Sequence, residues 1–276
     1  MPLFTRPKPS DDLSRSRRAL IEFSMALGGF AIGISEFSPM GLMTDIANDV
    51  NISEFQVGHL ISAYALGVMV GAPVLAIAGA RLLRHQLLIL LMGLFAVGNI
   101  ASAVAADYDL LLVCRFIAGM PHGAYFGVIA LVASSLAPAN GRAKAVSRVM
   151  LGIAFAMLFG SPLATRLGQL TDWRYVFGLV GLLSLFTLVM IFAFLPRNPD
   201  EQRSSALGEL KSLVNLNIWI ALAIASIGFA GMFCVFSYLA PTMLNVTMTE
   251  PEWIPVGLGM LGLGGIIGNI VGGWLF

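Results

Sequence analysis

The sequence predicts an all-α protein that crosses a membrane several times. Of its 276 residues, 58% are hydrophobic and only 11% are charged, whereas soluble domains are about 25% charged. The apolar residues gather in eight long runs, each close to the roughly 20 residues that a helix needs to span a bilayer. Both cysteines lie inside such runs, which favours a role as small apolar side chains over a disulfide or metal framework.

Eight helices are expected in order, one for each run. The predicted spans are 19–44, 55–80, 86–105, 109–136, 146–167, 174–195, 217–244 and 255–276. Residues 1–18 are expected to form a tail, because the run behind them is too long for a signal peptide and lacks a small-residue cleavage site. The one long polar stretch, 196–213, separates a six-helix bundle at 19–195 from the start of a second bundle at 214–276.

The positive charges lie on one side of the predicted membrane. Cytoplasmic loops carry an excess of lysine and arginine, and this excess sets the orientation of the helices. One side holds Arg6, Lys8, Arg15, Arg17, Arg18, Arg81, Arg84, Arg142, Lys144, Arg148, Arg197, Arg203 and Lys211. The other side holds Arg166 and Arg174 among acidic residues. We therefore expect a cytoplasmic N-terminus and a multi-pass position in an inner (plasma) membrane.

An internal repeat links the two predicted bundles. The triplet GFA at 29–31 and the pair FS at 37–38 recur at the same spacing at 228–230 and 236–237. Glycines of the second run recur in the eighth at nearly the same offset. Parallel repeats of this kind are typical of transporters built from two similar halves. We expect a protein of about twelve helices, of which this sequence holds about eight and would not transport alone.

Glu36 is the most unusual residue of the first run, because no other charge occurs between 23 and 44. A carboxylate at that depth is costly unless it is paired, protonated or hydrated. Glu36 lies roughly 25 Å along the first helix and Arg115 roughly 9 Å inside the far end of the fourth, so their depths match. A pair would reduce the desolvation cost of both charges, and a proton reaching Glu36 would break it. The alternative is a static ion pair that holds the two helices together.

His122 lies two turns beyond Arg115, next to Pro121. Proline has no N–H and so leaves the carbonyl of Ile117 without its helical partner. Either His122 relays protons or binds substrate, or it hydrogen-bonds the carbonyl that Pro121 frees.

Glu22 is a second acidic residue in the first run, fourteen residues before Glu36 and on nearly the same helix face. Arg18 is one turn away, which favours an interfacial pair between Glu22 and Arg18 over a role in transport.

Glycines at four-residue spacing are typical of helix packing in membranes. Gly67 and Gly71 form such a pair, and Gly264, Gly268 and Gly272 continue a similar stripe in the eighth run. The stretch GLGMLG at 257–262 matches the dinucleotide fingerprint only in letters, because that motif requires a preceding strand. The sequence has no P-loop, metal-ligand cluster or nucleophile–base arrangement, so we expect no enzyme, cofactor or metal.

Five ordered motifs resemble those of the major facilitator superfamily, in particular its drug:proton antiporter group near the arabinose-efflux permease (AraJ-like) proteins. They are SEFSPMGLMTDIA at 35–47, YALGVMVGAP at 64–73, RFIAGMPHGAYFG at 115–127, GSPLATRLG at 160–168 and WRYVF at 173–177. SYLAPTML and GNIVGG fit the seventh and eighth helices. The resemblance implies a major facilitator fold, truncated at about eight of twelve helices.

The resemblance also implies roles for single residues. Arg115 falls on the arginine of the fourth-helix signature, which is associated with proton transfer and substrate response. Gly152, Gly160 and Pro162 fall on the fifth-helix antiporter signature, which seals the interface against ion leak. The match is imperfect, because Ala156 and Ala164 replace expected glycines and a serine separates Gly160 from Pro162.

The loop signature between the second and third helices matches less well. Its usual aspartate is Ala80 here and its later glycine is Leu83, which leaves Arg81 and Arg84. This departure weakens the expectation of the charge latch that normally favours the outward-facing state.

Together, the residues and the resemblance predict a secondary transporter that exports a small organic solute in exchange for protons, with two halves rocking about a midplane cavity. Walls formed by Phe30, Phe37, Tyr64, Phe126 and Phe233 suit a drug, a sugar or a purine alike. The alternatives are proton-coupled uptake of a sugar or nucleoside, and a non-transporting membrane sensor or remnant. The expected partners are the solute, protons and the lipid bilayer, not nucleic acid, and the complete protein is expected to be monomeric.

Overall fold

Capping residues stand where several apolar runs begin. The side chains of Ser14, Ser53, Asp107 and Asp172 each accept a hydrogen bond from a backbone N–H two or three residues further on. Each bond satisfies one of the free donors of a first helical turn. Ser53 also forms a reciprocal capping box with Gln56.

The computed structural model describes residues 14–197 and 215–275, so most of the expected tail and of the expected connection at 196–213 lies outside the described residues. Its elements are α1 (Arg15–Gly41), α2 (Met43–Val50), α3 (Glu54–Gly79), α4 (Arg84–Ala103), α5 (Tyr108–Leu136), η1 (Ala139–Gly141), α6 (Arg142–Phe155), η2 (Ala156–Gly160), α7 (Ser161–Leu170), α8 (Trp173–Phe194), α10 (Leu216–Asn245), η3 (Pro251–Trp253) and α11 (Ile254–Leu275). Within these residues, seven helices are long and apolar enough to cross a membrane, with α6 to α7 counted as one.

The first expected span divides into two helices. α1 ends at Gly41 and α2 begins at Met43, with Leu42 between them at φ −105° and ψ 17°. Pro39 lies in the last turn of α1, where its missing N–H weakens the helical ladder. The helix therefore ends three residues before the predicted position at residue 44.

The fifth expected span is α6, η2 and α7 joined end to end. η2 is a π-helical turn in which the N–H of Ser161 bonds the carbonyl of Ala156, five residues back. Pro162 follows and brings no N–H to the next turn. Such turns occur as single insertions within α-helices, often at functional positions.

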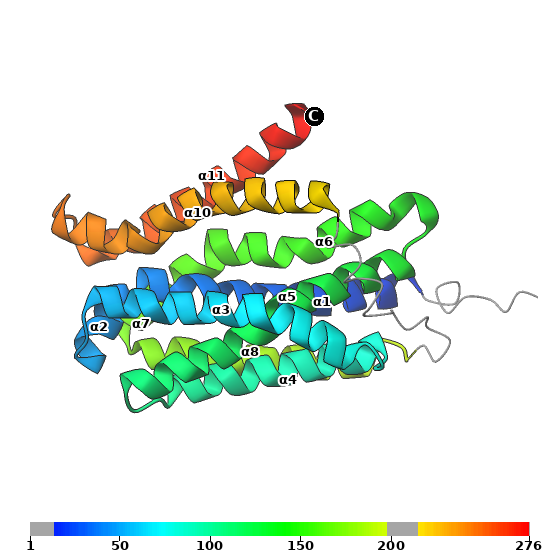
Figure 1. Cartoon of the computed structure of the whole chain (residues 1–276), viewed down its shortest axis with the longest axis horizontal. Coiled ribbons are helices and arrows are strands. Elements are labelled where there is room, and N and C mark those ends of the chain that lie inside the picture. The colour runs from blue at the N-terminus through cyan, green and yellow to red at the C-terminus, as the bar shows by residue number, and fades with distance from the viewer. Residues whose placement is uncertain (1–13, 198–214, 276) are drawn as a thin grey trace, which may run out of the picture.

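The long helices run side by side, and the turns that carry Arg81, Arg142 and Arg197 share one end of the bundle with the start of α1 (Figure 1). We call this end the basic end. α4 packs on α5 and α8, whereas α6 packs on α1. Buried apolar residues from these helices, among them Met25 and Phe95, form the main core.

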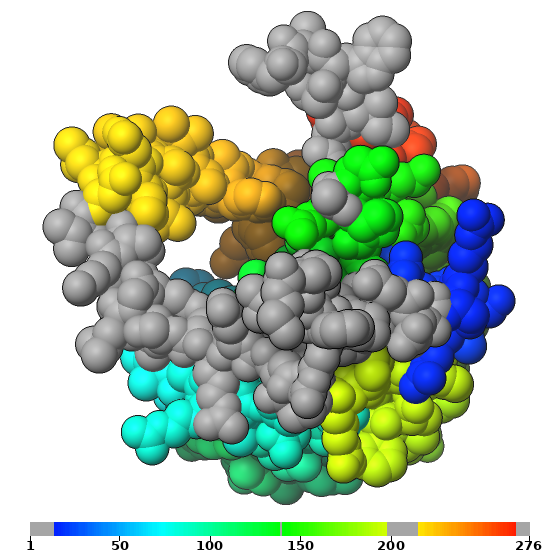
Figure 2. All heavy atoms as spheres, turned by 90° about the vertical axis from the view of Figure 1, so that its right-hand side faces the viewer, coloured from blue at the N-terminus to red at the C-terminus, as the bar shows by residue number. Residues whose placement is uncertain are grey.

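α10 and α11 contact the first six spanning helices mainly at the end opposite the basic end. The ring of Phe37 in α1 lies 6.1 Å from that of Phe233 and 5.2 Å from that of Phe236. Toward the basic end, a hollow separates α10 from the other helices (Figure 2) and α11 rises away from α6 (Figure 1). The interface between the two sets of helices is therefore closed at one end and open at the other.

α3 and α5 approach each other backbone to backbone. A Cβ added at Gly67 would meet the carbonyl oxygen of Phe116, and one added at Gly71 would meet backbone atoms of Met120. Close contact of this kind replaces hydrophobic burial as the force that joins helices in a bilayer. It also brings the middle of α3 against the middle of α5, where the candidate site lies.

Two glycines of the expected α11 stripe have no packing partner among the described residues. A Cβ added at Gly264 or Gly268 would meet no described residue within 4 Å. Gly262 instead lies against η2, where an added Cβ would come within 2.8 Å of the carbonyl oxygen of Met157. Gly272 lies in the last turns of α11, whose side-chain surroundings are outside the described part of the chain.

Candidate functional site

A cavity of about 260 Å³ lies between α1, α3, α5 and α10. It is lined by Glu36, Met40, Ile61, Tyr64, Ala65, Val68, Arg115, His122 and Phe233. Four helices meet here because α3 and α5 are joined by their glycines and because α10 leans on α1 at Phe37. The cavity therefore brings the three charged or titratable residues predicted from the sequence to one place, beside an aromatic wall.

Arg115 is fully buried, at 1% exposure, and its hydrogen bonds go to neutral groups. Its Nη1 donates to the hydroxyl of Ser35 at 2.9 Å and its Nη2 donates to the carbonyl of Ser35 at 2.8 Å. The guanidinium also lies over two rings, 4.4 Å from the centroid of Tyr64 and 5.0 Å from that of Phe177. Contacts of this kind stabilise a desolvated cation.

The direct ion pair expected between Glu36 and Arg115 is not formed. Both residues line the cavity, but no hydrogen bond or ion pair joins Glu36 to another residue in the described part of the chain. The similar depth of the two residues is as predicted. What differs is the direction of the side chains, because Ser35 rather than Glu36 faces the guanidinium.

His122 has a different hydrogen-bond partner from the one considered from the sequence. Its Nδ1 lies 3.0 Å from the hydroxyl of Tyr64 in α3, not against the carbonyl that Pro121 frees. Its ring also lies 5.2 Å from that of Phe126. Tyr64 therefore links two residues of α5, through its hydroxyl to His122 and through its ring to Arg115.

The expected aromatic walls separate into three groups. Tyr64 and Phe233 line the cavity. Phe37 is 97% buried and packs between helices, while Phe126 packs on His122 and against Gly29. Phe30, for its part, lines a second cavity. Only part of the aromatic set therefore faces the space that Glu36 and Arg115 share.

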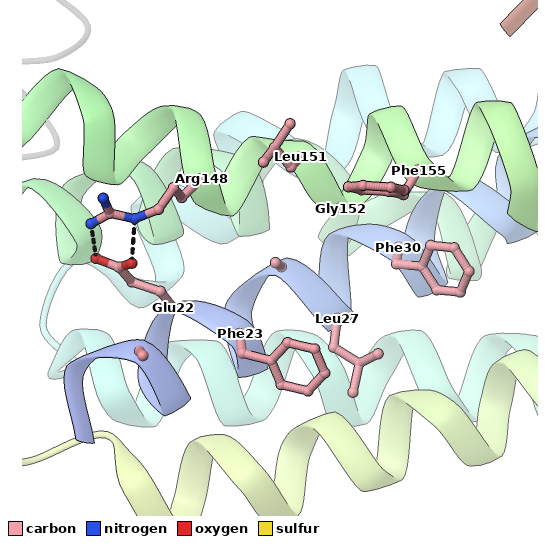
Figure 3. A pocket seen from close by; sticks show the side chains of 10 residues that line it. Glu22, Phe23, Leu27, Phe30, Arg148, Leu151, Gly152 and Phe155 are labelled. Atoms are coloured by element: carbon pink, nitrogen blue, oxygen red, sulfur yellow. Dashed lines mark hydrogen bonds and ion pairs between the residues drawn. The ribbon is translucent and has the colours of Figure 1, made fainter. Parts of the chain in front are cut away.

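The second cavity, of about 430 Å³, lies between α1 and α6 on the side of the basic end (Figure 3). Its floor is apolar, and at one edge Arg148 donates two hydrogen bonds to Glu22, at 2.6 and 2.7 Å. The sequence favoured an interfacial pair of Glu22 with Arg18; Glu22 does form an ion pair, but its partner is Arg148. The ion pair instead ties α1 to α6, across 126 positions of sequence.

The residues of the fifth-helix signature lie where α6 and η2 pack on α1 and α11. A Cβ added at Gly152 would meet the carbonyl of Ala26, and one added at Gly160 would come within 2.7 Å of Ile34. Pro162 faces α11, 3.7 Å from a Cβ added at Gly259.

One of the two alanines that depart from this signature, Ala156, has a glycine opposite it. A Cβ added at Gly33 in α1 would collide with the Cβ of Ala156. The small residue is therefore on the facing helix, and the close approach that the signature provides is kept. Arg81 is exposed in the turn between α3 and α4, and Arg84 begins α4.

Two residues of the site were not singled out from the sequence. Ser35 binds Arg115 directly, and its own hydroxyl donates to Oδ1 of Asn99 in α4 at 2.6 Å. Both are completely buried. The only signal available was that each is a polar residue inside a long apolar run.

The sequence is similar to a known protein family and to individual transport proteins. The sequence model described as "Major Facilitator Superfamily" matches residues 25–276. The chain is 38% identical over 252 residues to "Inner membrane transport protein YdhP" of Escherichia coli (strain K12), covering 91% of this chain and 65% of that protein. It is 34% identical over 250 residues to the AraJ protein of the same strain, covering 91% of this chain and 64% of that one.

Solved structures show the same fold at lower identity. A bacterial homolog of the human lysosomal transporter Spinster, in an inward-facing and occupied conformation, superposes with a TM-score of 0.75 at 18% identity, over 95% of this chain and 62% of that one. A D-xylose-proton symporter gives a TM-score of 0.65 at 19% identity, over 92% and 67%. This chain spans about 65% of the length of the curated relatives. With its family model matched over nearly the whole sequence and its helices arranged as in these transporters, the chain belongs to the major facilitator superfamily.

Proposed function

We propose that the complete protein is a secondary active transporter that exports a small organic solute across the inner membrane in exchange for protons. The observation that carries the proposal is the cavity between α1, α3, α5 and α10. It holds a buried cation, Arg115, and a carboxylate, Glu36, that has no hydrogen-bonded partner among the described residues. Charges in such a position are expensive and mark ion or substrate pathways.

The proton site in this proposal is Glu36. When ionised, Glu36 balances the charge of Arg115 across the cavity; when protonated, it leaves that cation uncompensated. The ionised and protonated states of Glu36 favour different occupants of the cavity and different arrangements of the two bundles. This difference couples proton movement to solute movement. The hydrogen bonds to Ser35 hold Arg115 in place in either state of Glu36. Arg115 therefore acts as a fixed positive charge rather than as an ion-pair partner that protonation releases.

The likeness to transporters supports a carrier rather than an enzyme. YdhP is named a transport protein, and a relative from Helicobacter acinonychis that is 30% identical is named "Probable sugar efflux transporter". The open interface at the basic end fits a carrier in which two bundles rock about a midplane cavity. We place the basic end, and with it the N-terminus, in the cytoplasm, because arginine and lysine gather there.

The decisive experiment is flux measured with the complete protein in proteoliposomes. An imposed proton gradient should drive solute movement against its own gradient, and Glu36→Gln and Arg115→Ala should each abolish the coupling. Glu54→Gln is the matched control, since Glu54 is a carboxylate near the membrane surface that accepts a hydrogen bond from Thr44. Undiminished coupling in both cavity variants would contradict the proposal.

The direction of the gradient separates the remaining possibilities. Solute that moves with the protons and accumulates on the side they enter indicates uptake by symport, and solute that moves opposite to the protons indicates export. Binding of solute without any flux indicates a sensor. Each of these two other outcomes would replace the proposed function.

A further inference from the structure

The buried guanidinium of Arg115 is held in place by dipoles rather than by a counter-ion. Its two terminal nitrogens bind the hydroxyl and the carbonyl of one residue, Ser35. Hydrogen bonds from a charged donor are stronger than those between neutral groups. Two such bonds in a fork geometry fix both the position and the plane of the guanidinium.

Asn99 determines which way the hydroxyl of Ser35 points. The Nδ2 of Asn99 donates to the carbonyl of Phe95 at 2.9 Å, so its Oδ1 is turned toward Ser35. The hydroxyl of Ser35 donates to that oxygen at 2.6 Å, which leaves its lone pairs facing Arg115. The bonds therefore run in one direction from α5 through α1 to α4, while the Nε of Arg115 has no hydrogen-bond partner among the described residues.

This chain of bonds competes with Glu36 for the same guanidinium. Glu36 follows Ser35 directly in α1 and lines the same cavity as Arg115. Successive helical residues point about 100° apart, so the guanidinium faces the neutral side chain and not the carboxylate beside it. In a low-dielectric site an oppositely charged neighbour would otherwise attract it strongly.

We propose that Ser35 and Asn99 are positioning residues that hold Arg115 away from Glu36 and so keep the carboxyl group of Glu36 free to exchange protons. The inference rests on the proposed function only for the use made of that proton. Charged and titratable groups that face Glu36 within the cavity are Arg115 and His122 from α5 and Tyr64 from α3; α10 contributes the apolar Phe233.

The test is the pH dependence of a reaction at Glu36 itself. A membrane-soluble carbodiimide such as dicyclohexylcarbodiimide reacts with a protonated carboxyl group: the proton passes to a carbodiimide nitrogen and the carboxyl oxygen adds to the central carbon. Labelling of Glu36 in the purified complete protein is followed by mass spectrometry across a pH series. This readout requires no transport.

Ser35→Ala and Asn99→Leu should move the labelling midpoint about 1–3 pH units toward acid, because the guanidinium then pairs with Glu36 and favours its charged form. If the two residues act as one chain, the double variant should shift no further than the larger single shift. Ser35→Thr keeps the hydroxyl and should restore the original midpoint.

Ser38→Ala is the matched control. Ser38 is also buried in α1, but its hydroxyl bonds the carbonyl of Ile34 within the helix, at 2.6 Å. An unchanged midpoint in both Ser35→Ala and Asn99→Leu overturns the inference, and so does a parent protein whose Glu36 is never labelled. A shifted midpoint together with no proton-driven flux in the parent would refute the proposed function and leave the positioning role intact.

Discussion

Replacing Gly119 with alanine should destabilise the bundle, whereas the same replacement at Gly127 should not. Both glycines belong to α5, two turns apart. A Cβ added at Gly119 would collide with the carbonyl oxygen of Tyr64 in α3 and would lie 3.2 Å from its Cα, whereas one added at Gly127 would meet no described residue within 4 Å. Because backbone atoms cannot move by changing a rotamer, α3 and α5 would have to separate.

The magnitude follows from two opposing terms. Alanine is favoured over glycine inside a helix by about 0.5–1 kcal/mol, and at Gly127 this gain stands alone. Over-packing a close interface costs about 1–3 kcal/mol, which at Gly119 exceeds the gain. The two variants should therefore differ in stability by about 1–3 kcal/mol in favour of Gly127→Ala.

The chain contains a natural reporter for this measurement. Cys114 is buried in α5, whereas Cys234 is exposed. In a Cys234→Ser background, a thiol-reactive fluorophore should label Cys114 only as the bundle opens on heating. Gly119→Ala should label at a lower temperature than the parent, and Gly127→Ala at the same or a higher one. Equal midpoints in the two alanine variants would refute the close backbone contact of α3 and α5.

Three further predictions use the same thermal assay. Asp49 lies outside the membrane-spanning segments, and hydrogen bonds from Arg174 and from an indole N–H lower the pKa of its carboxyl group below the usual value. The stability that the ionised Asp49 contributes is present above about pH 4 and is lost as the pH falls. This contribution stays under about 1 kcal/mol because the pair of Asp49 and Arg174 is exposed. Asp49→Asn should therefore lose less stability on acidification than the parent. Arg148→Gln should lower stability by about 1–3 kcal/mol because it leaves the buried carboxylate of Glu22 unpaired. Glu22→Gln should cost less, because the side chain of Arg148 is 43% exposed and can turn to water. The reverse order would contradict the bonded geometry. Tyr125→Phe removes a 2.8 Å hydrogen bond to a main-chain carbonyl of α1 and should lower stability by about 0.6 kcal/mol, so an unchanged midpoint would argue against that bond.

The spanning helices were predictable because length and apolar composition are the quantities that a bilayer selects. The breaks inside those runs were not. Leu42, which separates α1 from α2, is as apolar as its neighbours, and the π-turn at Ala156–Gly160 depends on which carbonyl each N–H reaches. Hydropathy contains no information on such local hydrogen bonding.

The depth of the site residues was predictable, but their direction was not. A rise of 1.5 Å per residue places Glu36 and Arg115 at similar depth whatever the packing, and both line one cavity. Which of two adjacent residues faces a given helix depends on the rotation of α1 about its axis. That rotation is set by contacts such as those of Gly33 and Gly41 with α6, η2 and α7, which no single run of sequence contains.

This distinction yields one more prediction, for Arg115→Lys. A lysine keeps the charge but lacks the planar fork that binds the hydroxyl and the carbonyl of Ser35 together. Its flexible ammonium group should therefore turn toward Glu36, so the labelling midpoint of Glu36 should move toward acid as it does in Ser35→Ala. If charge alone mattered, Arg115→Lys would label like the parent, and the geometry of the guanidinium would have no part in keeping Glu36 free. A fixed cation held by neutral groups allows a nearby carboxyl group to change its charge without first breaking an ion pair, and for that purpose arginine and lysine are not equivalent.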